Sequence, residues 1–211
     1  MTSTIAQTIQ SGIFVLDGAM GTAVQALDTD TKRDYLGREN CIDILTQSRP
    51  DLVRSIHDSF LAIGVDAIET NTFGANRLVL SEFDDEIAGW AYDLNVCAAQ
   101  IARQACKAAD GKRFVLGSMG PGTKLISLGQ TTWDDMLDSY TEQANGLLDG
   151  GVDAFLIETC QDVLQIKCAI SSCLDALAAR DKTTEDIPIM VSITIEATGT
   201  MLVGSDLQTV V

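Results

Sequence analysis

Carboxylates and glycines that directly follow apolar runs are the residues of this sequence best suited to chemistry. Asp17 comes after the apolar residues 13–16 and opens the stretch Asp17-Gly18-Ala19-Met20-Gly21-Thr22. A glycine-containing loop can offer free backbone N–H groups to a substrate carboxylate, while Asp17 can bind an ammonium group. A plain tight turn with a helix-capping aspartate is the alternative interpretation. We therefore expect Asp17 and Gly18 to bind a substrate.

Two further groups of polar residues end apolar runs. Glu158 follows residues 154–157, where a partly desolvated carboxylate would need a cation such as an amino-acid ammonium. Asn71 and Thr72 follow a second run and offer an amide and a hydroxyl. A structural salt bridge for Glu158 and a turn-stabilising role for Asn71 are the alternatives. We expect Glu158, Asn71 and Thr72 to join the same substrate site.

Other reactive residue types predict little chemistry. His57 is the single histidine, and a lone imidazole completes neither a metal site nor a catalytic triad, so we expect it at the surface of a helix. Six cysteines show no C-x-x-C spacing, which argues against a disulfide framework or a zinc ribbon. Cys160 could face the site as a thiolate, but no histidine lies near it in sequence. Residues 117–124 do not match a phosphate-binding loop and predict a tight turn. No metal ligand and no catalytic residue is assigned.

Composition limits the class of protein. The chain has 211 residues, of which 46% are hydrophobic and 21% charged, and its net charge is −16. These values are typical of one folded domain and argue against binding to nucleic acid or anionic membranes. We see neither a secretory signal nor an apolar run long enough to span a membrane, so we expect a cytoplasmic protein.

The elements that position these residues alternate along the chain. Continuous apolar runs predict five strands buried on both faces of a parallel sheet, at residues 13–16, 67–68, 114–116, 154–157 and 189–191. Apolar residues at helical spacing predict helices over 50–63, 86–109, 132–148 and 162–180. This alternation leaves a doubly wound sheet or a (β/α)₈ barrel.

Polar residues at the end of every predicted strand favour an α/β TIM (β/α)₈ barrel, because the strand ends of a barrel form one mouth. A partial repeat supports this choice: residues 64–70 read GVDAIET and residues 151–159 read GVDAFLIET. A barrel has eight strands in about 250 residues. We therefore expect residues 1–211 to be the N-terminal part of a barrel domain, truncated to about its first five βα units.

Five ordered motifs resemble the homocysteine S-methyltransferase family across almost the whole chain. They are VLDGAMGT at 15–22, IETNTF at 68–73, GSMGP at 117–121, LIET at 156–159 and PIMVS at 188–192. The first two most resemble the N-terminal homocysteine-binding module of the branch that contains the cobalamin-dependent methionine synthases. The betaine-dependent and S-methylmethionine-dependent branches stay open, as does a non-catalytic amino-acid-binding barrel. An aldolase-like or hydrolytic barrel that uses Glu158 and Asp17 as acid and base is a further alternative.

The resemblance implies a barrel that binds homocysteine and a zinc ion at its mouth and transfers a methyl group to the thiol. It implies that Asp17, Gly18 and Glu158 hold homocysteine, with Asn71 and Thr72 beside them. In the cobalamin-dependent branch, methylcobalamin on a separate module is the donor, and another module binds folate. The family's zinc cysteines lie in Gly-x-Asn-Cys and Gly-Gly-Cys-Cys motifs, which this sequence lacks. We therefore expect zinc ligands downstream of residue 211, and a 211-residue piece without activity of its own.

Overall fold

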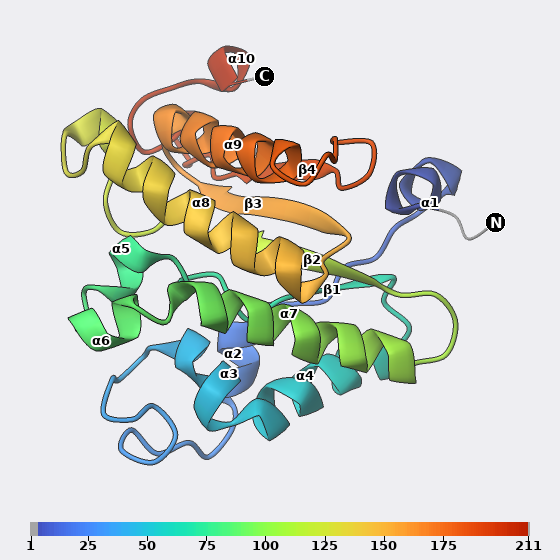
Figure 1. The fold of residues 1–211 in the computed structure, drawn as a ribbon. Coiled ribbons are helices and arrows are strands. Elements are labelled where there is room, and N and C mark those ends of the chain that lie inside the picture. Colours follow the sequence, from blue (N-terminus) through green and yellow to red (C-terminus); the bar gives the residue numbers. More distant parts are fainter. Residues whose placement is uncertain (1–3, 211) are drawn as a thin grey trace.

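The computed structural model describes residues 4–210, in which four parallel strands form one sheet in chain order (Figure 1). The strands are β1 (Ala67–Glu69), β2 (Phe114–Met119), β3 (Ala154–Cys160) and β4 (Ile189–Ile193). A doubly wound sheet reverses its strand order at a switch point, whereas a barrel keeps chain order around its circumference. The order β1-β2-β3-β4 is therefore that of a barrel segment and confirms the predicted fold class.

Four long helices pack beside the sheet: α4 (Pro50–Ala62), α7 (Ala91–Ala108), α8 (Trp133–Gly150) and α9 (Val163–Ala178). Figure 1 shows α7, α8 and α9 side by side in front of the strands. The predicted helices over 50–63, 132–148 and 162–180 are confirmed to within two residues at each end. Their N-termini carry the expected signals, since Pro50 opens α4 and the Thr132 and Asp162 side chains accept backbone N–H groups.

The shorter helices connect these elements. They are α1 (Ile5–Ser11), α2 (Met20–Gln25), η1 (Ile42–Ile44), α3 (Leu45–Ser48), α5 (Arg77–Leu80), α6 (Asp85–Ala88), η2 (Ile126–Leu128) and α10 (Leu207–Val210). The single helix predicted over 86–109 is wrong, because α6 ends at Ala88 and α7 begins at Ala91. Asp84 caps α6, and Trp90 leaves the helical region with ψ 0° before its carbonyl accepts the Leu94 N–H at 2.8 Å.

The strand predicted at 13–16 is present only as an isolated parallel bridge between Leu16 and Ala67. The chain does lie beside β1, because Val15 O accepts the Asp66 N–H at 2.8 Å and Asp17 N donates to Ala67 O at 3.2 Å. The Val15 N–H, however, donates to the Asp66 carboxylate at 2.8 Å instead of to a backbone carbonyl. The Asp66 side chain thus replaces one backbone hydrogen bond of the parallel pairing, and a regular strand does not form.

Side chains of the sheet alternate between a helix-facing core and the barrel interior. The helix-facing core contains Ile68, Val115, Met119, Phe155 and Ile157. The interior cluster contains Ala67, Phe114, Leu116, Ala154 and Leu156, together with Ile5 of α1. Because the alternation has a period of two, the next interior positions after Ala67, Leu116 and Leu156 are Glu69, Ser118 and Glu158.

The prediction that His57 lies at the surface is wrong. Its side chain is fully buried on α4, and neither ring nitrogen has a hydrogen-bond partner among residues 4–210. Val53 and Leu61, one turn away on each side, are also buried, so position 57 belongs to the core-facing stripe of the helix. Burial lowers the pKa of His57 to about 4, which keeps the ring neutral at physiological pH.

Candidate functional site

The polar end of the barrel interior is formed by residues of three neighbouring strands. Glu69 ends β1, Ser118 lies near the end of β2 and Glu158 lies near the end of β3. The register pairs Glu69 with Leu116 and Ser118 with Leu156, so each strand places its polar residue beyond an apolar interior neighbour. The carboxyl ends of barrel strands are where barrel enzymes place their sites. We call Asp17, Glu69, Ser118 and Glu158 the mouth residues.

Asp17 is held at the mouth by the backbone of β1. Both of its carboxylate oxygens accept the Glu69 N–H, each at 3.1 Å. The pKa of Asp17 is raised to about 7, mainly by burial and to a smaller extent by the charge of Glu158, although backbone N–H groups of Glu69 and of Asp17 itself oppose the shift. Asp17 is therefore poised near neutral pH instead of being a fully ionised surface carboxylate.

Glu158 is held by a hydroxyl from the neighbouring strand. The Ser118 Oγ–H donates a hydrogen bond to Glu158 Oε1. Burial raises the pKa of Glu158, and the Ser118 hydrogen bond lowers it. Ser118 thus favours the ionised form of a carboxylate that the surrounding apolar strands disfavour.

Glu69 is a third carboxylate in the same place. Burial raises its pKa to about 8, and the charges of Glu158 and Asp17 add to the shift. Within residues 4–210 no lysine, arginine or histidine forms an ion pair with Asp17, Glu69 or Glu158. Three clustered carboxylates without a cation cannot all ionise cheaply at pH 7, so the mouth is suited to bind a positively charged group such as an ammonium.

The remaining predicted site residues surround the mouth in different ways. Gly18 directly follows Asp17, and a Cβ at this position would lie 3.3 Å from the Phe60 ring. Asn71 is buried, and its amide donates to Ile42 O at 3.0 Å and to Thr46 Oγ1 at 3.2 Å. These bonds tie the segment after β1 to η1 and α3. A contact of Gly18 or Asn71 with substrate stays a prediction.

Thr72 belongs to a buried network beneath the mouth. Its hydroxyl donates to Ser118 O at 2.7 Å and lies 2.6 Å from the Thr70 hydroxyl, which accepts the Ser118 N–H at 3.0 Å. Gln143 of α8 donates to Thr72 O at 2.8 Å. The network fixes the β2 backbone at Ser118 and therefore the hydroxyl that holds Glu158. That Thr72 also meets substrate stays a prediction.

Ser118 and Glu69 are mouth residues that sequence reasoning did not assign. Both end apolar runs in the same way as Glu158, so the signal was present in their spacing. Residues 117–124 were assigned only to a turn, and Glu69 was passed over for the Asn71-Thr72 pair. The partnership of Ser118 with Glu158 depends on the register of β2 against β3, which no local pattern encodes.

The cysteines of this chain do not fit a catalytic zinc site. All six are free thiols, five of them buried, and residues 4–210 contain no group of three or more His, Cys, Asp or Glu side chains that could hold a metal. Burial raises the pKa of Cys160 to about 12, which keeps the free thiol protonated at neutral pH.

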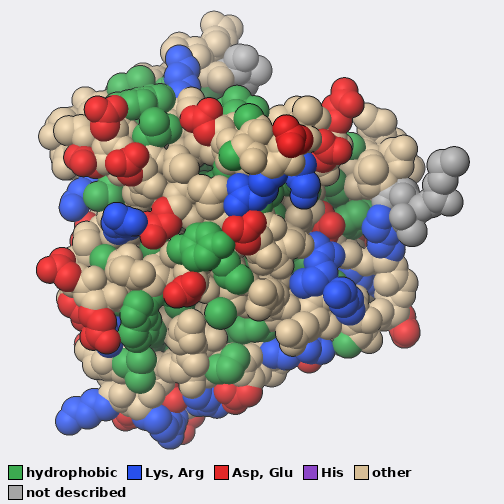
Figure 2. Space-filling model, viewed as in Figure 1, with side chains coloured by type: hydrophobic (Ala, Val, Ile, Leu, Met, Phe, Trp, Pro, Cys, Tyr) green, Lys and Arg blue, Asp and Glu red, His purple; other side chains and the backbone are tan. Residues whose placement is uncertain are grey.

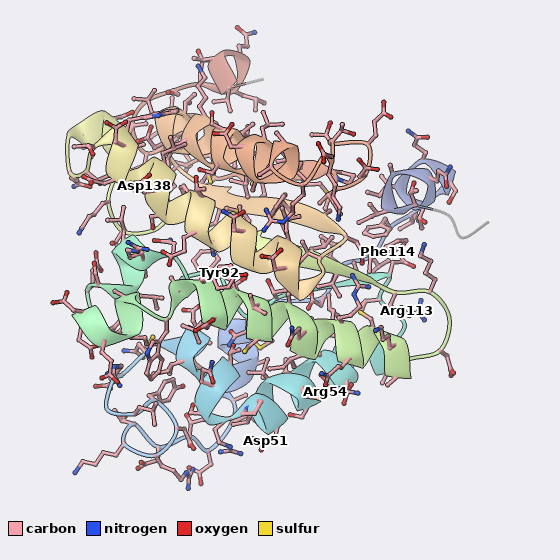
Figure 3. The ribbon with its side chains drawn as sticks, viewed as in Figure 1. Asp51, Arg54, Tyr92, Arg113, Phe114 and Asp138 are labelled. Atoms are coloured by element: carbon pink, nitrogen blue, oxygen red, sulfur yellow. The ribbon has the colours of Figure 1, made fainter. Side chains whose placement is uncertain are left out.

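A hollow in the described structure lies away from the mouth. It has a volume of about 490 Å³ and lies between α4 and α7, where Figure 3 shows Arg54 and Arg113 on neighbouring elements. Gly64 and Arg113, which precede β1 and β2, line it, so the hollow is at the amino ends of the strands. Its position separates it from the mouth residues.

None of the described helices is long and apolar enough to cross a membrane.

Comparisons with known proteins agree on one family. A family model described as homocysteine S-methyltransferase matches residues 14–211. The chain is 47% identical over 198 residues to a methionine synthase of Mycobacterium tuberculosis (strain ATCC 25618 / H37Rv), covering 92% of this chain and 16% of that protein. It is 45% identical over 204 residues to a methionine synthase of Mycobacterium leprae (strain TN), covering 95% and 16%. The chain thus spans 16% of the length of these curated relatives.

Solved structures of the homocysteine methyltransferase MmuM from Escherichia coli share the fold. The metallated form matches with a TM-score of 0.72 and 19% identity, covering 96% of this chain and 70% of that chain. The oxidised form matches with a TM-score of 0.71 and 21% identity, covering 94% and 68%. At these identities the likeness concerns the fold alone.

Proposed function

The chain belongs to the homocysteine S-methyltransferase family, and we propose that it is the homocysteine-binding part of a methionine synthase-type enzyme. Such an enzyme transfers a methyl group to the homocysteine thiol and forms methionine. The single observation that carries the proposal is the group of three carboxylates at the mouth without a cation partner among residues 4–210. The α-ammonium group of homocysteine supplies the missing positive charge.

In this proposal the mouth residues bind and orient the substrate. Asp17 and Glu158 accept hydrogen bonds from the α-ammonium group, and the backbone at Gly18 faces the α-carboxylate. Charge-assisted hydrogen bonds of this kind are about twice as strong as neutral ones. Thr72 and Asn71 keep the ends of the strands in place through the bonds described above. The amino-acid end of homocysteine is thereby fixed, and its thiol is left free for the methyl donor.

The remaining parts of the reaction belong to a longer protein. The relatives in the two mycobacteria are methionine synthases of which this chain covers 16%. They favour methylcobalamin over betaine or S-methylmethionine as donor, with cobalamin- and folate-binding modules in the same parent chain. Because the cysteines of residues 4–210 do not fit zinc, its ligands lie elsewhere in that parent. Six free cysteines agree with a reducing, cytoplasmic location.

The test is the variant Glu158→Gln in the full-length enzyme, with Glu185→Gln as a matched control on an exposed loop. Loss of one charge-assisted bond predicts a rise of about tenfold or more in the KM for homocysteine. We expect a small change in kcat and an unchanged zinc content, because the carboxylate binds substrate and not metal. A parallel loss of zinc and activity, or a KM equal to that of the control, would contradict the assignment.

A further inference from the structure

Thr159 interrupts β3 directly after Glu158. Its backbone is left-handed, with φ 60°, and the pairing of β3 with β4 shifts register between Ile157 and Cys160. An extra residue in one strand that shifts the register is a β-bulge, a feature that often re-aims a side chain next to a site. Thr159 is the residue at which this bulge turns.

The burial of the flanking residues shows what the bulge does. Leu156 and Glu158 belong to the interior side of β3, whereas Phe155 and Ile157 belong to the helix-facing core. Uninterrupted alternation would turn Cys160 to the interior, yet Cys160 is fully buried in the helix-facing core. Thr159 is the inserted residue, and its side chain is exposed beside Glu158.

A threonine is an unfavourable choice for this conformation. Branching at Cβ makes positive φ a genuine outlier, whereas glycine adopts it freely and asparagine or aspartate tolerate it. The other non-glycine residues with positive φ in the described chain are Leu36, Asn40 and Asp181, none of them β-branched. Strained residues persist where the surroundings hold them, and they cluster at ligand sites. The threonine side chain therefore contributes something that glycine would not.

The hydroxyl of Thr159 differs from the other hydroxyls at this end of the barrel. Those of Thr70, Thr72 and Ser118 are all engaged in hydrogen bonds within the protein. The Thr159 hydroxyl is exposed and has no hydrogen-bond partner among residues 4–210, although its Cα lies one residue, about 3.8 Å, from that of Glu158. It is the hydroxyl of this group that is available to a ligand.

We propose that Thr159 is a further substrate-contact residue, whose hydroxyl forms a hydrogen bond with the polar end of the amino acid that Glu158 holds. A hydroxyl can donate to the α-carboxylate or accept from the α-ammonium group. The left-handed bulge places an exposed Thr159 directly after Glu158 at the mouth end of β3. The inference rests on the proposed function, since the ligand is taken to be homocysteine.

The test compares Thr159→Ala with Thr159→Ser in the full-length enzyme, with homocysteine as the titrant in calorimetry. Both variants keep a Cβ at the left-handed position, and only the serine keeps a hydroxyl. We expect the Kd to rise about tenfold in Thr159→Ala and to stay within about twofold of the unaltered enzyme in Thr159→Ser. Unchanged binding by Thr159→Ala, or a serine variant as weak as the alanine variant, would overturn the proposed contact.

A second pair of variants separates contact from backbone strain. Thr159→Gly and Asp181→Gly each relieve a left-handed non-glycine residue, and Asp181 lies on an exposed turn after α9. We expect both to raise Tm and only Thr159→Gly to weaken homocysteine binding. If Thr159→Gly and Asp181→Gly bound homocysteine equally well, Thr159 would have a structural role alone. Absence of homocysteine binding in the unaltered enzyme would instead overturn the proposed function, and this inference with it.

Discussion

At the scale of single residues, the ionisation of the mouth carboxylates is linked to folding. Burial raises the pKa of Glu69 to about 8 from its ordinary 4.5, and the charges of Glu158 and Asp17 act in the same direction. The folded protein therefore holds a proton that the unfolded chain releases above about pH 4.5. The free energy of unfolding contributed by this group is present at low pH and is lost as the pH rises toward 8.

This linkage predicts the behaviour of Glu69→Gln. The amide is neutral at every pH, so the variant should be more stable than the unaltered protein at pH 8, by about 1–2 kcal/mol, with a difference that disappears near pH 4.5. Urea unfolding at several pH values measures it. The exposed Glu185→Gln should show no such trend. A difference that is equal at pH 5 and pH 8 would mean that Glu69 does not carry a buried charge.

The residues of the site differ in how far sequence alone could place them. Asp17 and Glu158 were predicted at the mouth because each directly follows an apolar run, and the structure brings both there. The bond between Ser118 and Glu158 arises from strand register and was not predictable from spacing. His57 was misplaced because a histidine was read as polar, although its spacing from Val53 and Leu61 marks a buried position.

At the scale of elements, helices with strong capping residues at their ends were predictable, whereas element boundaries without such residues were not. Pro50 is the first residue of α4, and the side chains of Thr132 and Asp162 cap the N-termini of α8 and α9. Gly151 caps the C-terminus of α8 with φ 93°. The break before α7 was missed because apolar residues keep a helical spacing through residues 86–109, whereas the backbone leaves the helical conformation between Ala88 and Ala91. The run at 13–16 was predicted as a strand, but apolar composition cannot show that the Asp66 side chain takes a backbone N–H group there.

The contact between α7 and α8 depends on a glycine within the second helix. A Cβ on Gly150 would lie 2.5 Å from Ala99 Cβ and 2.7 Å from Val96 O. Figure 3 places Tyr92 between the same two helices, where its hydroxyl donates to Asp149 at 2.7 Å. Close packing of the two backbones leaves no space for a side chain at position 150.

We therefore expect Gly150→Ala to destabilise the protein even though alanine favours helix by about 1 kcal/mol. Overpacking of this severity costs about 1–3 kcal/mol, which predicts a net loss of stability and a lower Tm. Thermal unfolding measures it, and Thr141→Ala on the same helix is the control for helix propensity. A Tm for Gly150→Ala equal to or above that of the control would show that α7 and α8 can move apart without a loss of stability.

At the scale of the whole molecule, the distribution of charge separates surface from site. The chain carries a net charge of −16, and Figure 2 shows acidic and basic side chains interspersed over the helical face. Surface carboxylates have arginine partners: Arg38 lowers the pKa of Asp84, and the Tyr92 hydroxyl together with Arg180 lowers the pKa of Asp149. The mouth carboxylates lack such partners among residues 4–210, so substrate charge and not surface charge is expected to control the site.

The last prediction concerns which part of the proposed full-length enzyme binds zinc and which part binds the amino-acid end of the substrate. In the proposed function, residues 1–211 provide the carboxylates that bind the amino-acid end of homocysteine. Their thiols are mostly buried and form no metal-binding group in the described part. A thiol bound to zinc loses its proton near neutral pH, so zinc content and proton release should occur together. We expect both in the full-length enzyme on addition of homocysteine, and neither in residues 1–211 alone. Atomic absorption and a pH indicator measure them, with circular dichroism to confirm that the shorter chain is folded. Stoichiometric zinc in folded residues 1–211 would mean that their own cysteines bind metal and that the site has a different organisation.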